Sequence, residues 1–173
     1  MKKGINSVFI AFLWTVGPPY VFSADWESTV NNNDTCIISE LSGEVGVVMS
    51  HYPSSHFELA LASQNWKSLI HDREYTIDIE FDQKGAWKMP MTAEASGDLK
   101  VLKGYFDDNK GVDFFKEFTL SDSMYAGYKG KTLVTKSLAG SMKAYYRMME
   151  CVNGQNQLDS TQSGRPNSRD PFL

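Results

Sequence analysis

The sequence is poor in cysteine and histidine, and it carries no basic excess. It has two cysteines and three histidines among 173 residues, and its formal net charge is -4. The cysteines, Cys36 and Cys151, are too far apart to form a CxxC redox pair. An acidic chain without a basic stripe argues against binding to nucleic acid or to an anionic membrane.

Two common catalytic motifs are also missing. Ser141 lies in residues 139–143 (AGSMK), which lack both outer glycines of the G-x-S-x-G elbow. Residues 127–132 (GYKGKT) contain a Gly-Lys pair, but position 125 is Tyr, where a phosphate-binding loop needs its first glycine. We therefore identify no catalytic residue in the sequence, and we predict no metal and no cofactor.

The first 23 residues have the charge and hydrophobicity order of a cleavable export signal. Lys2 and Lys3 precede an apolar run over residues 8–16 (VFIAFLWTV), well short of the about 20 residues that span a bilayer. A Gly-Pro-Pro break and small residues follow, so we expect cleavage after Ser23, or alternatively after Ala24. The other interpretation is an uncleaved interfacial or anchoring helix. The sequence thus predicts a periplasmic or secreted bacterial protein with no stable membrane span after signal cleavage.

The two cysteines lie in the part of the chain that remains after cleavage. An oxidising compartment favours their pairing over free thiols, so we predict a disulfide between Cys36 and Cys151. A closure of about 100 residues could stabilise the fold by about 4 to 5 kcal/mol. The alternative is two separate buried thiols. Composition further predicts a flexible lead-in over residues 24–34, a single globular domain over residues 35–154, and a disordered polar tail over residues 155–173.

Short β-branched or alternating runs dominate the domain. The clearest is residues 74–82, where Tyr75, Ile77, Ile79 and Phe81 alternate with polar side chains. This run forms a hairpin with the next one, in which Pro90 indicates an edge strand or a bulge. The predicted strands cover residues 35–41, 45–50, 56–62, 74–82, 86–92, 99–105 and 131–136.

Two segments have helical spacing of their apolar residues. We predict a short helix over residues 112–120 and a longer one over 138–152, with a loop at 121–130 between the first helix and the last strand. Together the elements predict an α+β, β-rich fold. Its six to eight mostly antiparallel strands form a sandwich or a curved sheet, closed by the C-terminal helix and one disulfide.

Several aromatic residues fall at predicted strand ends or in loops. Exposed rings at such places suit the binding of a protein or a glycan, whereas core packing is the default alternative. The candidate binding surface consists of Trp66, Trp87, Tyr125 and Tyr128, and Tyr105 belongs to the same group. The leading functional prediction is an exported binding or interaction protein, envelope- or host-associated and without catalytic activity.

A small hydrolase or metal-dependent enzyme is the alternative function. A turn could bring His51 and His56 together, and with Glu58 or Asp72 they could form a weak zinc site. A row of carboxylates, Asp78, Glu80 and Asp82, lies on the wet face of one predicted strand. Such a row could bind Ca²⁺ or supply an acid/base pair if another strand brought its own oxygens, although a solvated sheet face kept soluble by like charges is the simpler explanation.

Two stretches resemble a known family in their layout. Residues 135–144 (TKSLAGSMKA) run from a strand through Ser-Leu-x-Gly into a helix, and residues 66–81 run from a turn into an alternating strand. Both are similar to the invasion-associated locus B proteins of alphaproteobacteria, and the chain also resembles other small two-cysteine exported proteins of proteobacteria. The resemblance implies export and a β-rich fold. It carries over no functional residue, and the additional internal cysteines expected of that family are missing here.

Overall fold

The computed structural model describes residues 26–31, 35–52, 56–82 and 85–163. The predicted leader, residues 1–23, lies outside them. The described part forms strands β1 (Glu27–Val30), β2 (Cys36–Glu40), β3 (Gly46–Tyr52), β4 (His56–Ser63), β5 (Glu74–Phe81), β6 (Ala86–Ser96), β7 (Leu99–Phe106), β8 (Ser123–Tyr128) and β9 (Lys131–Ser137), with helices α1 (Asp108–Leu120) and α2 (Ser141–Ser163).

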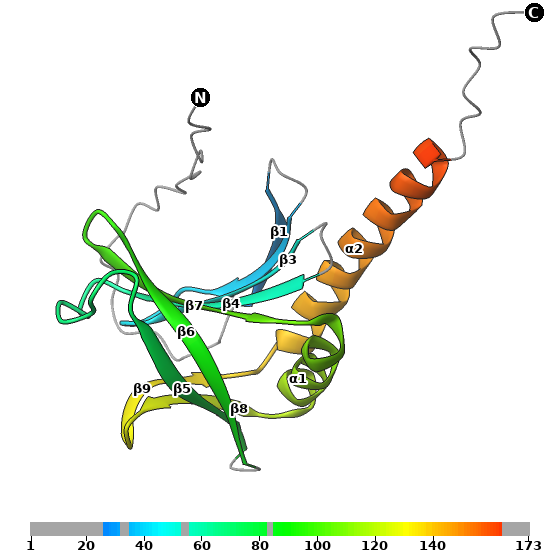
Figure 1. Ribbon diagram of the computed structural model, residues 1–173. Helices are drawn as coiled ribbons and strands as arrows, with labels where there is room; N and C mark the ends of the chain where they lie inside the picture. The colour runs from blue at the N-terminus through cyan, green and yellow to red at the C-terminus, as the bar shows by residue number, and fades with distance from the viewer. Residues whose placement is uncertain (1–25, 32–34, 53–55, 83–84, 164–173) are drawn as a thin grey trace, which may run out of the picture.

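All nine strands belong to one antiparallel sheet. Their order is β1-β2-β3-β4-β7-β6-β5-β8-β9, and every neighbouring pair is antiparallel. The sheet is strongly curved, and both helices lie together at one end of it (Figure 1). The predicted β-rich fold, a curved sheet with a C-terminal helix, is therefore confirmed, with more strands than the six to eight expected.

The long strand β6 is the point where the sheet bends. Its first part, from Ala86 to Thr92, pairs with β5, whereas only the part from Thr92 to Ser96 pairs with β7. The sheet therefore splays between β6 and β7 toward the start of β6, and α1 lies at that end, where the Trp87 indole N–H donates to Glu117. Pro90 falls in the part of β6 that pairs with β5 and not with β7, so its missing N–H removes no bond toward β7. Pro90 was predicted on an edge strand or at a bulge. It lies on a strand inside the sheet, but at a position where only β5 pairs with that strand.

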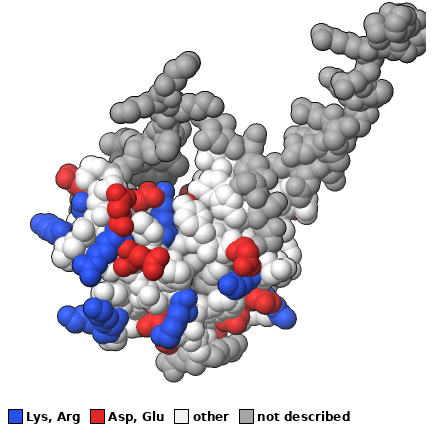
Figure 2. Space-filling view, in the orientation of Figure 1, with Lys and Arg blue, Asp and Glu red and all other residues white. Residues whose placement is uncertain are grey.

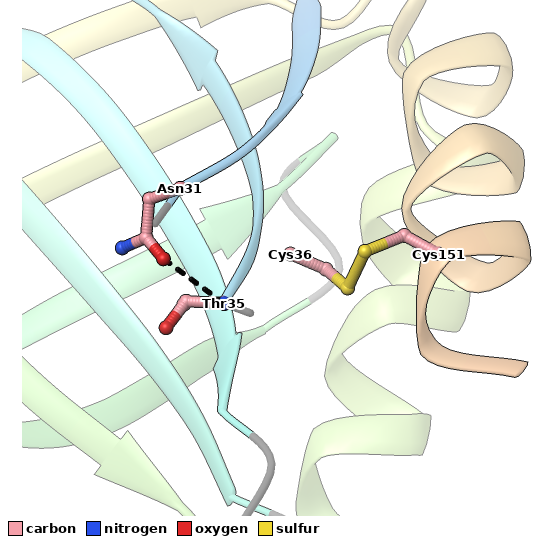
Figure 3. The surroundings of a disulfide bond; sticks show 4 residues. All are labelled: Asn31, Thr35, Cys36 and Cys151. Atoms are coloured by element: carbon pink, nitrogen blue, oxygen red, sulfur yellow. Dashed lines mark hydrogen bonds between the residues drawn. A yellow bond between two sulfur atoms is a disulfide. The ribbon is translucent and has the colours of Figure 1, made fainter. Parts of the chain in front are cut away.

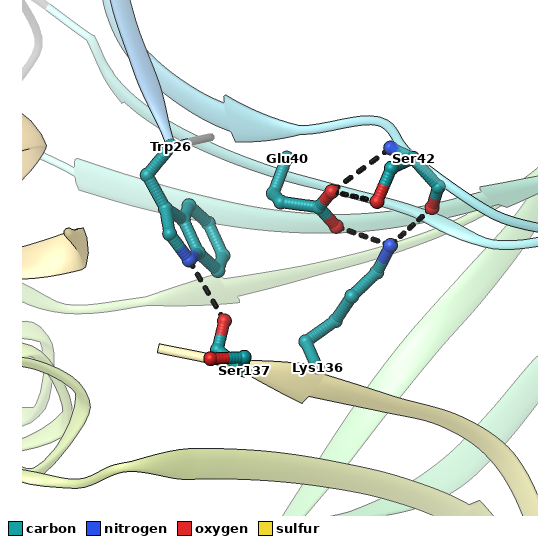
Figure 4. Close-up of polar contacts among 5 residues, drawn as sticks. All are labelled: Trp26, Glu40, Ser42, Lys136 and Ser137. Atoms are coloured by element: carbon teal, nitrogen blue, oxygen red, sulfur yellow. Dashed lines mark hydrogen bonds and ion pairs between the residues drawn. The ribbon is translucent and has the colours of Figure 1, made fainter. Parts of the chain in front are cut away.

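The two edges of the sheet are held near each other by side chains. The Trp26 indole N–H donates to the carbonyl of Ser137 at 3.0 Å, which links the start of β1 to the end of β9. The Lys136 ammonium forms an ion pair with the carboxylate of Glu40 and donates to the carbonyl of Ser42 (Figure 4). These contacts between sheet edges form what we call the seam.

Phenylalanine side chains of α1 fill the end of the sheet beside the helices. Phe114, Phe115 and Phe118 are all buried, and their rings pack edge to face or tilted against rings from the strands. The helix begins at Asp108, four positions before the predicted start, because the Asp107 carboxylate accepts the N–H of Lys110 at 2.9 Å. The Asp-Asn-Lys-Gly composition of residues 108–111 is typical of a turn, which is why the sequence does not reveal this first helical turn.

The predicted disulfide is confirmed. Cys36 at the start of β2 is joined to Cys151 on α2, with the Cα atoms 6.0 Å apart and the residues 115 positions apart in sequence (Figure 3). Next to it, the Asn31 side chain accepts the N–H of Thr35 at 3.0 Å, which holds the β1–β2 connection. The bond therefore ties the first strands to the last helix.

Three predictions about the ends and loops were wrong. Residues 27–30 were expected in a flexible lead-in but form β1, which pairs with β2. Residues 123–128 were expected in a loop but form β8, with Met124 and Ala126 in the core. The helix α2 continues to Ser163, through residues that were expected in a disordered tail. In the described part of the chain, neither helix combines the length and the apolar character needed to cross a membrane.

Candidate functional site

A small apolar cavity opens at the end of the sheet opposite the helices. Its volume is about 150 Å³. The floor consists of Ile77 on β5 and Leu102 on β7, both of which are almost fully buried. The lining residues are Trp66, Ser68, Leu69, Tyr75, Ile77, Leu102, Tyr128 and Leu133.

The connection between β4 and β5 forms one wall of this cavity. Trp66 accepts a hydrogen bond from the N–H of Leu69 at 3.2 Å, so the backbone turns and both side chains face the cavity. The end of the connection is fixed to β6, because Asp72 donates to the carbonyl of Ala93 at 2.8 Å and Ala93 donates to Arg73 at 2.9 Å. The wall is therefore anchored at its base by backbone bonds.

Two tyrosines form the opposite wall. The rings of Tyr75 and Tyr128 meet edge to face with centroids 5.5 Å apart. The hydroxyl of Tyr75 accepts the N–H of Ile70 at 3.1 Å, which connects this wall to the β4–β5 connection. Arg73 lies 5.7 Å from the Tyr75 ring centroid, and Lys129 lies 5.2 Å from that of Tyr128. The cavity thus has an apolar interior and cationic side chains packed on its aromatic rim.

The structure brings together two of the four predicted binding residues. Trp66 and Tyr128 both line the cavity. Trp87 lies at the other end of the sheet, where its indole N–H donates to Glu117 at 2.9 Å and its ring packs on Phe114. Tyr125 lies on the outer face of β8, so neither it nor Trp87 reaches the cavity.

Sequence reasoning missed the other cavity residues for a simple reason. The alternation along β5 places Tyr75 on the same face as the buried Ile77 and Ile79, but it gives no sign that the core is hollow beside Tyr75. Leu69 and Leu133 were not singled out at all. The alternation of the strands gives the direction of each side chain, but a cavity depends on which side chains from distant strands fail to fill the space between them.

The structure does not bring His51 and His56 together. Their pairing partners show that they project from opposite faces of the sheet: His51 pairs with Phe57 and His56 with Tyr52. The His51 ring packs 4.5 Å from that of Phe57, on the core side, whereas the His56 ring stacks 4.7 Å from Tyr52 on the outside. Among the residues that the structure describes, no group of three or more His, Cys, Asp or Glu side chains could hold a metal ion.

Local contacts account for two of the three carboxylates in the row on β5. Asp78 pairs with Lys88 at 2.8 Å. Asp82 accepts the backbone N–H groups of Asp122 and Ser123 at 2.9 Å each. These backbone hydrogen bonds are the main reason that the pKa of Asp82 is lowered from its ordinary value. Asp82 therefore holds the start of β8 against the end of β5.

Glu58 has a different environment, on the outer face of β4. It is 6% exposed, and the Tyr52 hydroxyl donates to its carboxylate at 3.1 Å. Tyr105 lies directly opposite Glu58 on β7, and the ring of His56 stands between the two tyrosines. Burial first, and then the Glu58 charge, raise the pKa of Tyr105 to about 12 and that of Tyr52 further still. We call Tyr52, His56, Glu58 and Tyr105 the outer cluster.

Comparison of the chain with protein-family models, with curated proteins and with solved structures finds no match. On the face shown in Figure 2, acidic and basic side chains are interspersed rather than gathered into separate patches.

Proposed function

We propose that the protein is an exported binding protein, periplasmic or secreted, that holds a small apolar group of its partner in the cavity opposite the helices. The observation that carries this proposal is the convergence of Trp66, Tyr75 and Tyr128 on one apolar space from three separate elements. Ligand sites in proteins are typically concave, largely apolar, and bordered by a few polar groups. A dry apolar cavity of about 150 Å³ is large enough for a group of the size of benzene.

The chemistry of the lining favours an apolar side chain of a protein partner over a glycan. The deep residues Ile77 and Leu102 offer no hydrogen-bonding groups, and the Tyr75 hydroxyl, which accepts the N–H of Ile70, has only its own proton left to donate. A sugar placed there would leave its own hydroxyls without partners, which costs free energy. An aromatic or aliphatic group has no hydroxyls to leave without partners.

Two further features support export. A disulfide that joins distant parts of the chain is typical of proteins that fold in an oxidising compartment. The first residues have the order of an export signal, with Lys2 and Lys3 ahead of a short apolar run. The N-terminus of native protein is the measurement that tests this part.

The cavity can be tested with benzene as a probe of its apolar interior. We expect saturable shifts of the Leu102 and Leu133 methyl resonances in NMR spectra of the oxidised protein. Leu133→Phe should fill the space and weaken the binding at least tenfold. Tyr146→Ala, which removes a 62% exposed ring from α2 at the other end, is the matched control and should leave it unchanged. Shifts that do not saturate, or that persist in Leu133→Phe, would refute the proposal.

A further inference from the structure

The outer cluster is assembled by strand pairing from three strands. Tyr52 on β3 lies opposite His56 on β4, and Glu58 on β4 lies opposite Tyr105 on β7. Because side chains alternate along a strand, all four project from the outer face, away from Phe57 and the core. The cluster is therefore separate from the cavity, which is lined from the inner face.

Glu58 is a buried carboxylate without a cationic partner among the described residues. Tyr52 donates to it at 3.1 Å, but none of the ion pairs in the described part of the chain includes it. The nearest lysine along β7, Lys103, is paired with Glu94 at 2.9 Å. Since a carboxylate removed from water is stabilised most by a paired positive charge, this site favours a cation from outside the chain.

Aromatic rings surround this carboxylate. The His56 ring stacks on Tyr52 with centroids 4.7 Å apart, and it meets Tyr105 edge to face at 5.8 Å. Tyr105 is 57% exposed, so an approaching group meets its ring first. Ring faces attract cations, and the attraction grows when water is excluded. Both tyrosine hydroxyls are protonated at neutral pH, as tyrosines ordinarily are, so they can act as hydrogen-bond donors beside Glu58.

We propose that the outer cluster binds an alkylammonium group, with the ammonium against the Glu58 carboxylate and its methylene chain across the rings of Tyr52 and Tyr105. Glu58 supplies the charge, and the rings supply cation–π and apolar contacts. A lysine side chain of a protein partner and a free small amine share this chemistry. The outer cluster and the cavity would then recognise two different features of what the protein binds.

The test uses n-butylammonium as the probe, with the full-length oxidised protein at low salt. Titration calorimetry and NMR should show saturable binding, with upfield shifts of the probe methylenes from the tyrosine rings. Butan-1-ol, of the same length without the charge, should bind at least tenfold more weakly. Equal binding of butan-1-ol to the unmodified protein would overturn the proposal, and this comparison needs no variant to fold.

Variants then assign the binding to these residues. Glu58→Gln should lose at least tenfold in affinity, whereas Glu80→Gln, a half-buried carboxylate on β5, should change it less than twofold. Tyr105→Phe keeps the ring and should retain most of the affinity, and Tyr105→Leu should lose several-fold. Unchanged binding in Glu58→Gln would overturn the assignment. Leu133→Phe should leave this binding intact, so failure here and failure of the cavity proposal are distinguishable.

A titration with Nα-acetyl-lysine N-methylamide distinguishes the two sources of the ammonium group. Binding at least as strong as that of n-butylammonium supports a peptide-borne lysine. Much weaker binding, with n-butylammonium still bound, assigns the site to free amines. Binding of neither probe would refute the proposal.

Discussion

Lys136 and Glu40 form an ion pair that is almost closed off from water. Their side chains are 8% and 2% exposed. Both Ser42 donors, the backbone N–H at 3.0 Å and the hydroxyl, bind the Glu40 carboxylate, and the Ser42 carbonyl accepts from Lys136. Ser42 therefore satisfies both members of the pair, which is what a buried pair needs to be tolerated.

Removing one member of this pair should be costly. We expect Lys136→Met to lower the free energy of unfolding by about 3 to 5 kcal/mol, because it leaves the Glu40 charge buried without its partner. The double variant Lys136→Met with Glu40→Gln should recover a large part of that loss. Urea unfolding at pH 7 gives all the values needed for a double-mutant cycle.

Lys131, exposed on the same strand, provides the control. Lys131→Met should change stability by less than about 0.5 kcal/mol. If Lys136→Met costs no more than this control, the pair does not hold the seam.

The carboxylate of Asp82 makes stability depend on acid pH. Its folded pKa is lowered, chiefly by the hydrogen bond from the backbone N–H of Asp122, from an ordinary value of about 4. A lowered folded pKa contributes stability above the unfolded pKa, and this contribution disappears as the pH falls through the folded value. We therefore expect Asp82→Asn to lower the urea midpoint at pH 7, and the difference from the unmodified protein to shrink below about pH 4.

An exposed carboxylate in the β6–β7 turn provides the comparison for this variant. Asp98→Asn removes the same charge without the bonds to β8 and should show no such convergence. A constant difference between Asp82→Asn and the unmodified protein from pH 7 to pH 2.5 would contradict the linkage.

At the level of elements, two helical glycines should respond oppositely to the same substitution. Alanine in place of glycine stabilises a helix interior by up to about 1 kcal/mol. At Gly154 on α2 an added Cβ meets nothing within 4 Å, so Gly154→Ala should stabilise. At Gly111 on α1 the Cβ would lie 3.0 Å from Cε2 of Phe57 and closer still to Cδ2.

Phe57 is buried and packed against Phe115, so its ring has little room to move. Gly111→Ala should therefore destabilise by about 1 to 3 kcal/mol, as overpacking of a core does. Thermal unfolding of both variants shows whether each substitution raises or lowers the unfolding midpoint. Stabilisation by Gly111→Ala would show that α1 does not press on β4.

These elements differ in how well the sequence predicted them. Strand β5 was predicted because its alternation of buried and exposed residues lies within one continuous run. For β8 the sequence predicts a loop, because glycine and tyrosine, present here as Gly127 and two tyrosines, are common in loops. An added Cβ at Gly127 would lie 2.6 Å from the Tyr125 hydroxyl, so the glycine serves ring packing inside a strand. Strand β1 was missed because its hydrogen bonds come from β2, across an Asn-rich connection.

The candidate sites were less predictable than the fold. Trp66 and Tyr128 were selected as exposed aromatics, but their meeting depends on how the β4–β5 connection folds back. The outer cluster requires β4 to pair with β7, far along the chain, and no local pattern indicates that pairing. The alternation of side chains along a strand does explain why His51 and His56 do not meet. Tyr52 pairs with His56 and so shares its face of the sheet, and the neighbouring His51 therefore projects from the opposite face.

For the molecule as a whole, the seam and the disulfide tie the first strands to the last strand and the last helix. Trp26 is buried and donates to Ser137 (Figure 4), and Cys36 is bonded to Cys151 (Figure 3), so the start of the described chain is held against β9 and α2. Processing after Ser23 leaves Trp26 in place, whereas processing beyond Trp26 would remove the bond to β9.

We expect native protein from an envelope or culture fraction to begin at Ala24, or at Asp25 if cleavage follows Ala24, and to contain no free thiol. N-terminal sequencing and mass spectrometry after alkylation measure both properties. Trp26→Phe, which keeps an aromatic ring but removes the indole donor, should lower the free energy of unfolding by about 1 kcal/mol. Native material that retains the leader, or that carries both thiols free, would contradict export, because a reducing interior would not maintain a bond between such distant segments.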